Sequence, residues 1–229
     1  MTYKILVAED DKAIRDSIGI YLKNANYDVI YAKDGVEAVE AFQREGADLV
    51  IMDLMMPRLS GEEAILQLRA QSYVPIIILS AKGEEYDKVI GLNIGADDYI
   101  TKPFNPLELM ARVSSNIRRF YEYRDGQHKN KVIAHGDIQL DLFAKTVEVR
   151  GDIVHLTSIE FMILKLLMEN PNRVFSVDEI YENVWNEPAI DVKTVTVHIR
   201  RIREKIELNP KHPIYLQVVW GLGYKFATK

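Results

Sequence analysis

The first 123 residues alternate short apolar runs with amphipathic segments, and this alternation limits the possible folds more than any other feature of the chain. Runs such as Leu49-Val50-Ile51-Met52 are apolar at every position, as are strands of a sheet that is covered on both faces. Alternating strands and helices at this spacing predict an α/β domain, a doubly wound, flavodoxin-like sheet of five parallel strands with its binding site at their carboxyl ends. The expected strands are Tyr3–Ala8, Tyr27–Tyr31, Leu49–Met52, Pro75–Leu79 and Asp98–Thr101, and the expected helices are 11–24, 34–45, 60–70, 84–94 and 105–123.

A polar and aperiodic stretch at 124–131 ends this pattern, and we predict that it is a linker between two domains. Short alternating runs, stretches of helical length and two closing runs follow at 132–229. This order predicts an α+β domain that ends in a hairpin, with Thr157 as the N-cap of its first helix. The expected strands are Ile138–Phe143, Thr146–Val149, Tyr215–Val219 and Tyr224–Phe226, and the expected helices are 158–170, Val177–Trp185 and Asp191–Leu208.

The composition excludes several classes of protein. The chain has no cysteine, so it holds no disulfide or thiolate metal site, and a reducing cytoplasm suits it. No apolar run approaches the roughly 20 residues that cross a bilayer. A strand-like segment begins at Tyr3, where a signal peptide would lie. We therefore expect a cytoplasmic protein without a membrane segment.

The net charge of −5 conceals an asymmetry between the two halves. Residues 1–125 hold 15 Lys and Arg against 21 Asp and Glu, a net of −6, and residues 126–229 hold 14 against 13, a net of +1. The cations of the second half include a cluster at Arg200, Arg201, Arg203 and Lys205. Such a local cluster can bind phosphates although the whole chain is acidic.

Acidic side chains follow two of the predicted strands where each strand ends. Glu9, Asp10 and Asp11 come directly after the first run. Asp53 comes directly after the third. If both strands are central and parallel, these carboxylates converge at one edge of the sheet, where their repulsion requires a compensating cation. Carboxylate oxygens suit a hard cation, above all Mg²⁺.

A hydroxyl and an ammonium group belong to the same predicted edge. Ser80 follows the fourth run and Lys102 follows the fifth. A carboxylate, a divalent metal, a hydroxyl and a lysine form a set suited to phosphoryl transfer, in which the carboxylate attacks phosphorus and the other groups stabilise its oxygens. Each residue alone is more typical of a helix N-cap or a solvated surface, but matching positions at four strand ends favour a site.

Three kinds of function are compatible with these residues: a phosphorylation-controlled regulator, an enzyme with an Asp nucleophile, and a nucleotide-binding module. A phosphatase of the haloacid-dehalogenase type normally has a second Asp two residues after the nucleophile, where this chain has Met55. A nucleotide-binding module would need a glycine-rich loop after the first strand, which this chain lacks. Turnover of a small phosphodonor separates an enzyme from a regulator, which stalls after one phosphoryl group per chain.

The helix expected at 191–208 has a core stripe and a cationic face. The stripe consists of Val192, Val195, Ile199, Ile202 and Ile206. The opposite face holds Lys193, Val197, Arg200, Arg201 and Glu204, with Thr194 at its margin. Such a helix can enter the major groove of DNA, where Val197 would meet a thymine methyl group and Arg201 a guanine edge. The residues expected to contact phosphates are Lys193, Thr194, His198, Arg200 and Arg203. A solvated basic face is the alternative.

Four motifs of the first half resemble the receiver domain of response regulators. They are Ile-Leu-Val-Ala-Glu-Asp-Asp at 5–11, Met-Asp-Leu-Met-Met-Pro at 52–57, Leu-Ser-Ala at 79–81 and Gly-Ala-Asp-Asp-Tyr-Ile-Thr-Lys-Pro-Phe at 95–104. The resemblance extends over 1–123 and implies that Asp53 is the phosphoacceptor, with Lys102 and Ser80 beside it. The Mg²⁺ ligands that it implies are Glu9, Asp10, Asp53 and the backbone carbonyl of Met55, with Asp11 as a supporting neighbour.

The same resemblance implies a switch. Ser80 swings toward the phosphoryl group and Tyr99 turns into the vacated space, which alters the face made by the fourth helix, the fifth strand and the fifth helix. It also implies a cis peptide bond between Lys102 and Pro103. Because the apolar Met55 cannot orient an attacking water molecule, we predict a long-lived phosphoryl group.

The second half resembles the winged-helix domain of the OmpR/PhoB subfamily of response regulators over 132–229. The motifs are Leu-Thr-Ser-Ile-Glu-Phe-Met-Ile-Leu at 156–164, Thr-Val-Thr-Val-His-Ile-Arg-Arg-Ile-Arg at 194–203 and Gln-Val-Val-Trp-Gly-Leu-Gly-Tyr-Lys-Phe at 217–226. The resemblance implies DNA contacts by Trp220 and Tyr224 of the wing. Trp220 stands where the subfamily often has an Arg that enters the minor groove, so it packs on the core or on the sugar backbone instead. Some VanR-like regulators look similar at this position.

The OmpR/PhoB resemblance also implies partners. These are a sensor histidine kinase, promoter DNA with direct or inverted half-sites, RNA polymerase, and a second copy of the chain. Intermolecular salt bridges between receiver domains would hold the dimer. The residues expected on this dimer face are Lys88, Asp97, Asp98, Glu108, Arg112 and Arg119. Asn93 departs from the pattern, because an acidic residue often stands at its position.

Overall fold

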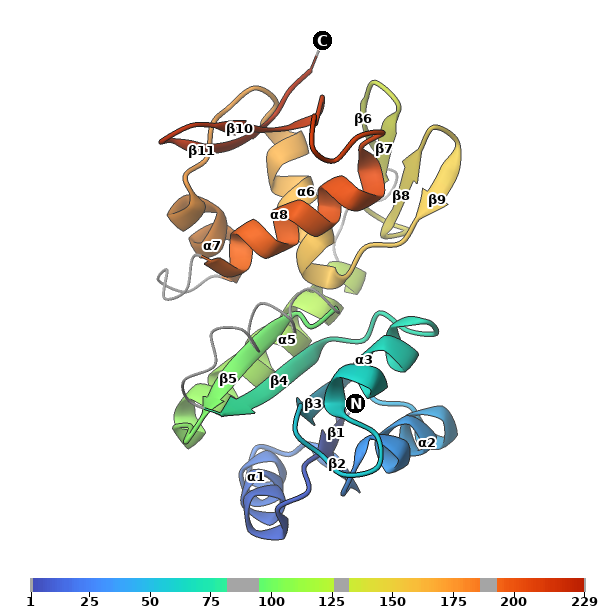
Figure 1. Cartoon of the computed structure of the whole chain (residues 1–229), viewed down its shortest axis with the longest axis vertical. Helices are drawn as coiled ribbons and strands as arrows, with labels where there is room; N and C mark the ends of the chain where they lie inside the picture. Colours follow the sequence, from blue (N-terminus) through green and yellow to red (C-terminus); the bar gives the residue numbers. More distant parts are fainter. Residues whose placement is uncertain (1, 82–94, 126–131, 186–192, 229) are drawn as a thin grey trace. The chain divides into compact units, whose positions relative to one another are not determined.

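The structure is a computed structural model that describes residues 2–81, 95–125, 132–185 and 193–228 (Figure 1). The helix expected at 84–94 lies outside these residues. The chain divides into two compact units, Met1–Tyr123 and Arg124–Lys229. Within the described ranges, no helix combines the length and the apolar character that crossing a membrane requires.

The first unit contains the predicted five-stranded parallel sheet. The strand order is β2-β1-β3-β4-β5, and all neighbours run parallel. The strands are β1 (Lys4–Ala8), β2 (Asp28–Ala32), β3 (Leu49–Asp53), β4 (Ile76–Ala81) and β5 (Asp98–Lys102). The chain builds outward from β1 to β2 and then returns to β3 on the other side of β1. In sheets of this kind ligands bind at such a reversal, beside the carboxyl ends of the strands, which here are β1 and β3.

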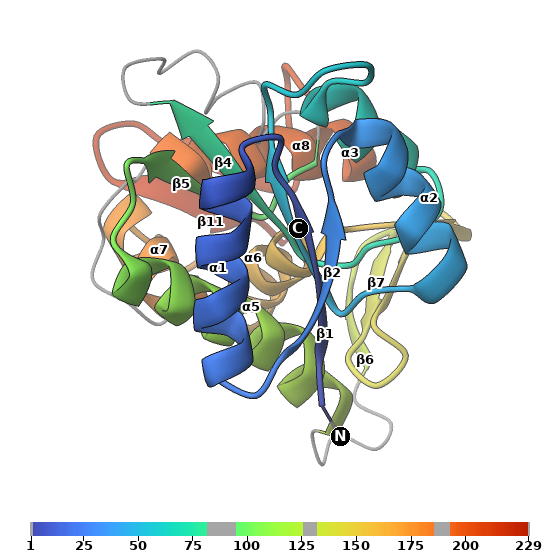
Figure 2. The ribbon, with the colours of Figure 1, turned by 90° about the horizontal axis from the view of Figure 1, so that it is seen from below.

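Helices cover both faces of this sheet (Figure 2). α1 (Lys12–Asn24) and α5 (Pro106–Asp125) pack on one face, where Ile18 and Leu109 join the buried strand residues in one core. α2 (Gly35–Glu45) and α3 (Gly61–Arg69) lie against each other on the opposite face. Because both faces are covered, every residue of β3 is buried, as its apolar sequence predicts.

The second unit begins with a four-stranded antiparallel sheet, of which the sequence predicts only the inner two strands. The strands, in sheet order, are β6 (Val132–His135), β7 (Ile138–Asp141), β8 (Thr146–Val149) and β9 (Asp152–Val154). The outer strands β6 and β9 contain no fully buried residue, so they lack the alternating pattern that marks β7 and β8. Backbone pairing to β7 and β8 places them instead.

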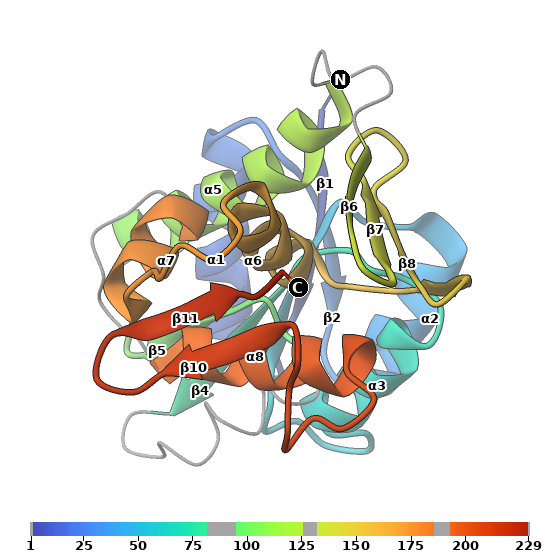
Figure 3. The same ribbon diagram turned by 90° about the horizontal axis from the view of Figure 1, so that it is seen from above.

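Helices and a hairpin complete this unit (Figure 3). α6 (Ser158–Glu169) begins after the expected N-cap Thr157, whose side chain accepts the Glu160 N–H in a capping box. The remaining elements are α7 (Val177–Trp185), α8 (Lys193–Ile206), β10 (Leu216–Val219) and β11 (Gly223–Phe226). β10 and β11 form an antiparallel hairpin, as the sequence predicts.

Candidate functional site

Three acidic side chains meet at the carboxyl edge of the first unit's sheet. Glu9 and Asp10 follow β1, Asp53 ends β3, and the two strands are paired. One oxygen atom of each carboxylate lies within 4.8 Å of the others. Glu9 is fully buried and Asp53 is 5% exposed, whereas Asp10 is exposed. This cluster offers the oxygen ligands that Mg²⁺ prefers.

The ammonium group of Lys102 lies between two of these carboxylates. Its Nζ donates to Asp53 Oδ2 at 2.7 Å and lies 2.6 Å from Glu9 Oε2. Burial alone would lower the pKa of Lys102, but its hydrogen bonds to Asp53 and Glu9 raise the pKa above the ordinary value. The lysine therefore keeps its proton and supplies a positive charge beside Asp53. The expected cis peptide bond between Lys102 and Pro103 is present.

Glu9 shows the electrostatic cost of this arrangement. The pKa of Glu9 is raised to about 7, because burial and the negative charge of Asp53 together outweigh the opposing effect of Lys102. Two carboxylates this close ionise together only when cations compensate them. A divalent cation bound by the cluster would favour the ionised form of both, so the residues present fit Mg²⁺.

Asp11 has a structural role beside the cluster. It is the N-cap of α1, and its Oδ1 accepts hydrogen bonds from the backbone N–H groups of Ala13 and Ile14 at 2.8 and 3.0 Å. These hydrogen bonds hold the pKa of Asp11 below its ordinary value. The supporting role expected of Asp11 is thus to start the helix that follows the acidic cluster.

Ser80 and Tyr99 lie on the neighbouring strands β4 and β5. Ile78 pairs with Tyr99 in the parallel register, so the side chains of Ser80 and Tyr99 face the same side of the sheet. The Ser80 hydroxyl is buried and has no hydrogen-bond partner among the described residues. An unpaired buried hydroxyl of this kind fits an acceptor oxygen that arrives at Asp53. Tyr99 is 9% exposed.

The loop after Asp53 depends on a glycine, Gly61, that belongs to none of the sequence motifs. Gly61 N–H donates to Leu54 O at 2.9 Å, and a Cβ on Gly61 would lie 2.0 Å from the Asp53 carbonyl oxygen. Glycine is therefore required where α3 begins against the end of β3. Within this loop, Met55 N–H donates to Asp53 Oδ1 at 3.2 Å, and the Met55 residue is 73% exposed.

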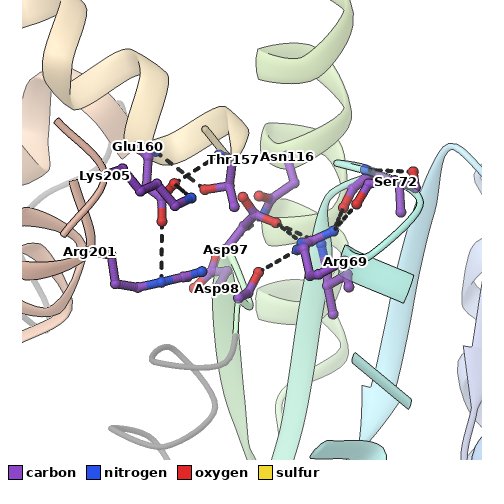
Figure 4. Close-up of polar contacts among 12 residues, drawn as sticks. Arg69, Ser72, Asp97, Asp98, Asn116, Thr157, Glu160, Arg201 and Lys205 are labelled. Atoms are coloured by element: carbon purple, nitrogen blue, oxygen red, sulfur yellow. Dashed lines mark hydrogen bonds and ion pairs between the residues drawn. The ribbon is translucent and has the colours of Figure 1, made fainter. Parts of the chain in front are cut away.

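Asp97, expected on a dimer surface, is fully buried in the first unit (Figure 4). Its Oδ2 accepts hydrogen bonds from Arg69 Nη2 at 2.7 Å and from the Ile76 N–H at 2.9 Å. The expectation that Asp97 takes part in intermolecular bridges is therefore wrong. Its position directly before β5 turns the carboxylate inward, where it ties the end of α3 to the start of β4.

Asp98 and Arg112 also pair within the chain. Arg112 Nη1 donates to both oxygens of the Asp98 carboxylate, at 2.8 and 3.0 Å, and Arg112 Nε donates to Glu108 at 3.2 Å. Arg119 is 7% exposed. Lys88 and Asn93 lie outside the described residues. An intermolecular bridge through Asp98 or Arg112 would therefore replace an existing ion pair rather than add one.

In the second unit, α8 has the core stripe that the sequence predicts, but of the described residues on the predicted outer face only Arg200 and Glu204 are exposed. The buried stripe consists of Val195, Ile199, Ile202 and Ile206, while Val192 lies outside the described residues. Thr196, Arg200 and Glu204 form the exposed line of the helix, with Val197 half-buried beside it. Thr196 is absent from the predicted set. The side chain of Lys193 lies outside the described part of the structure.

Thr194 and His198 are buried rather than exposed. They lie one turn apart at the edge of the core stripe and are 3% and 0% exposed. The His198 ring lies 5.9 Å from the ring of Trp185. The phosphate contacts expected of both side chains do not fit these positions. The helical period places both residues on the side of α8 that faces the core.

Glu160 of α6 contacts two cations of α8 (Figure 4). The Glu160 side chain is fully buried, with Arg201 Nε 3.3 Å from Oε1 and Lys205 Nζ 2.6 Å from Oε2. Burial alone would raise the pKa of Glu160, but the charges of Arg201 and Lys205 hold the pKa below its ordinary value. The guanine contact expected of Arg201 would therefore require its guanidinium to leave a buried carboxylate.

Arg203 near the end of α8 and Glu207 directly after it hold the β10–β11 hairpin. Glu207 is buried and accepts hydrogen bonds from three successive backbone N–H groups, 214–216, at 3.0, 3.0 and 2.8 Å. Arg203 Nε donates to Leu216 O at 2.8 Å, and its guanidinium carbon lies 5.7 Å from the centre of the Tyr224 ring. Arg203 and Tyr224, both expected to contact DNA, thus contact each other and fix the hairpin on the helix.

Comparisons with known proteins match both units. Residues 5–114 match the response regulator receiver domain family, and residues 151–226 match the family described as transcriptional regulatory protein, C terminal. The uncharacterized transcriptional regulatory protein YcbL of Bacillus subtilis is 40% identical and covers 97% of this chain and 99% of its own length. The regulatory protein VanR of Enterococcus faecium is 39% identical, with 98% and 99% covered.

A similar solved structure indicates the OmpR/PhoB subfamily. The response regulator DrrB of Thermotoga maritima, described as an OmpR/PhoB homolog, is 33% identical with a TM-score of 0.50, and 99% of this chain and 100% of that chain are covered. The identity to VanR is no higher than the identity to YcbL, so the comparisons do not favour a VanR-like role over others.

Proposed function

The chain belongs to the two-component response regulators of the OmpR/PhoB type, and on this premise we propose that phosphorylation of Asp53 controls its binding to promoter DNA. A sensor histidine kinase is the proposed phosphodonor, and the cytoplasm is the proposed location. One observation carries the proposal: Asp53 is nearly buried at the end of a central strand, with the Lys102 amine 2.7 Å away and two further carboxylates beside it.

In the proposed transfer, the Asp53 carboxylate attacks the phosphorus atom, and the bond from phosphorus to the leaving group of the donor breaks. The Lys102 ammonium group neutralises charge on the phosphoryl oxygens, and the Ser80 hydroxyl donates a hydrogen bond to one of them. Mg²⁺ would supply further positive charge to these oxygens. Its proposed ligands are Glu9, Asp10, Asp53 and the backbone carbonyl of Met55.

The proposed switch begins when Ser80 moves toward the phosphoryl group and Tyr99 turns into the space beside it. This changes the face of β5 and α5 and favours a receiver dimer. Asp98 and Arg112 already pair within the chain, so dimer formation exchanges such pairs between copies. Direct or inverted half-sites would match the paired DNA-binding units, and RNA polymerase would contact the bound dimer.

The proposed DNA face is the exposed side of α8. Val197 and Thr196 would face base edges in the major groove, and Arg200 would contact phosphates together with Lys193. Arg201 has a structural partner in Glu160, so we assign it chiefly to the positioning of α8. The cationic face of this helix then reads the promoter although the chain as a whole is acidic.

Phosphorylation is tested on the full-length protein with acetyl phosphate and Mg²⁺, followed by intact mass measurement. The wild-type chain should gain one phosphoryl group, and removal of Mg²⁺ by a chelator should prevent the gain. Asp53→Asn should gain none. Asp28→Asn, which changes an exposed Asp at the start of β2, is the matched control and should behave as wild type. Phosphorylation of the Asp53→Asn variant would contradict the proposal.

The output is tested on the same samples. Phosphorylated wild-type protein should dimerise in light scattering and bind selected duplex DNA more tightly than the unphosphorylated protein, while Asp53→Asn should respond in neither assay. If dimerisation and DNA binding are the same with and without the phosphoryl group, the proposed control is refuted. Continued turnover of acetyl phosphate beyond one group per chain would instead favour a phosphatase.

A further inference from the structure

The segment 54–60, between β3 and α3, contains the one proposed Mg²⁺ ligand that is a backbone atom. This ligand is the carbonyl oxygen of Met55. A side-chain ligand can reach a cation by changing its rotamer, but a carbonyl oxygen moves only with the backbone. Met55 and Pro57 are exposed, so contacts with the core do not fix these two residues. Their position must therefore depend on what ties the segment to the neighbouring elements.

An ion pair ties the segment to the start of α2. Arg58 Nε donates to Asp34 Oδ2 at 2.7 Å, and Arg58 Nη2 contacts the same oxygen atom. Asp34 is 1% exposed, and as the N-cap of α2 it also accepts a hydrogen bond from the Glu37 N–H at 3.0 Å. Burial alone would raise the pKa of Asp34, but hydrogen bonds from the Glu37 N–H and from Arg58 hold the pKa below its ordinary value. Asp34 is therefore a charged, buried anchor for the Arg58 guanidinium.

The backbone beside this ion pair is held as well. Gly35 N–H donates to Leu59 O at 3.1 Å, and a Cβ on Gly35 would lie 2.4 Å from that oxygen. Arg58 itself has a φ of 65°, which lies in the left-handed region that residues other than glycine rarely adopt. Such a conformation persists where the surrounding contacts over-determine it. The ion pair and the Gly35 hydrogen bond are such contacts, so they fix the backbone shortly after Met55.

We propose that Arg58 is a positioning residue for the Mg²⁺ site: through Asp34 it holds the backbone of 54–60, and with it the Met55 carbonyl, in place before the cation binds. The proposal rests on the Mg²⁺-dependent phosphorylation of Asp53 proposed above. Residues that orient metal ligands without touching the metal typically change its affinity by roughly 10–100-fold. Because Arg58 acts on only one of the proposed ligands, we expect an effect at the lower limit, about tenfold.

The sign of this effect separates positioning from simple electrostatics. Arg58 carries a positive charge in the same loop as a cation site, so by charge alone its removal would strengthen cation binding. Loss of positioning weakens cation binding instead. A further alternative is that the ion pair only stabilises the fold, in which case the affinity of the folded protein for the cation is unchanged.

Binding of Mn²⁺ to the full-length, unphosphorylated protein tests the proposal, because Mn²⁺ accepts the same oxygen ligands and its free ion is counted by electron paramagnetic resonance. Arg58→Gly removes the guanidinium and leaves a residue that suits the φ of 65°. It should raise the dissociation constant of Mn²⁺ about tenfold. Arg58→Lys restores a cationic partner for Asp34 and should recover most of the affinity. Arg44→Ala, which removes an exposed arginine of α2, is the matched control and should bind as wild type.

The Mg²⁺ dependence of phosphorylation by acetyl phosphate is the second readout. In Arg58→Gly the Mg²⁺ concentration at half-maximal rate should rise about tenfold, while saturating Mg²⁺ should restore most of the wild-type rate. A merely structural role would lower the rate at every Mg²⁺ concentration, and an unchanged half-maximal concentration would overturn the proposal. Circular dichroism checks that Arg58→Gly is folded; if it is not, Arg58→Asn takes its place, because asparagine also adopts the left-handed conformation.

These measurements distinguish the two proposals. If wild-type protein binds Mn²⁺ and gains a phosphoryl group, and Arg58→Gly does both at the same metal concentrations, the positioning role fails while the proposed function stands. If Arg58→Lys binds Mn²⁺ as weakly as Arg58→Gly, the ion pair with Asp34 is not the cause and the positioning role fails. If wild-type protein neither binds Mn²⁺ nor gains a phosphoryl group, the proposed function fails and the positioning role fails with it.

Discussion

Replacing Glu160 by glutamine removes a buried negative charge while keeping the shape of the side chain. The acceptor for the Thr157 N–H, 3.0 Å from Oε2, is retained, so the loss falls on the ion pairs with Arg201 and Lys205. Removing one partner of a buried ion pair costs about 3–5 kcal/mol. The Arg201 and Lys205 side chains are 11% and 27% exposed and would regain part of their hydration. We therefore expect a loss near the lower limit, about 3 kcal/mol.

Both tryptophans, Trp185 and Trp220, belong to the second unit, so tryptophan fluorescence in urea follows the unfolding of that unit within the full-length chain. With an m value of about 1.5 kcal/mol/M, the expected loss lowers the urea midpoint by about 2 M. Glu182→Gln, an exposed change on α7, is the matched control and should stay within about 0.5 kcal/mol of wild type. Equal midpoints for Glu160→Gln and this control would refute the reasoning.

The difference in unfolding free energy between wild type and Glu160→Gln should depend on pH in a defined direction. The pKa of Glu160 in the folded protein lies below its ordinary value of 4.5, so its contribution to stability is complete above that pH. The contribution is lost as the pH falls through the folded-state pKa. Acidification below pH 4.5 should therefore narrow the difference in unfolding free energy between wild type and Glu160→Gln. A difference that widens with acid would contradict the assigned direction.

The remaining predictions concern α8 and the loop after Asp53. Arg201→Ala should lower the unfolding free energy of the second unit by about 2 kcal/mol or more, because it leaves Glu160 buried with only Lys205. The Arg200 side chain is 70% exposed, so Arg200→Ala should leave the unfolding free energy unchanged. The same variant should make the salt slope of DNA binding shallower by about 0.9. If urea unfolding and binding titrations show the opposite pattern for the two variants, both assignments are rejected. Met55→Asn should shorten the lifetime of the phosphoryl group on Asp53, because an amide can orient water at this exposed position, and an unchanged rate of label loss would show that Met55 does not limit hydrolysis.

The receiver sheet and the acidic cluster could be predicted because their signals are local. A strand buried on both faces is apolar along its length, as Leu49–Met52 of β3 are, and a side chain at its carboxyl end must lie at the edge of the sheet. Asp53 and Lys102 could therefore be placed together from the positions of two predicted strands. Gly61 could not, because the steric demand comes from the carbonyl oxygen of Asp53, which only the folded loop brings near.

Charged residues were harder to place, because a charge in the sequence does not reveal its partner. Asp97 is a charged residue of the kind usually found at the surface, but its ion pair with Arg69 compensates the charge of the buried carboxylate. Arg201 lies on the predicted outer face of α8, but Glu160 reaches it from α6. In both cases the partner lies more than two dozen residues away in the chain, where no helical or strand period connects the two.

The anchoring of the β10–β11 hairpin by Glu207 and Arg203 also bears on the thermodynamics of association. A loop that must become ordered on a ligand spends part of the interaction energy on lost conformational freedom. In the β10–β11 hairpin this conformational freedom is lost during folding, because the buried Glu207 carboxylate already holds the backbone of 214–216. The turn at 219–222 is accordingly carried by strands whose backbone is already fixed in the folded unit.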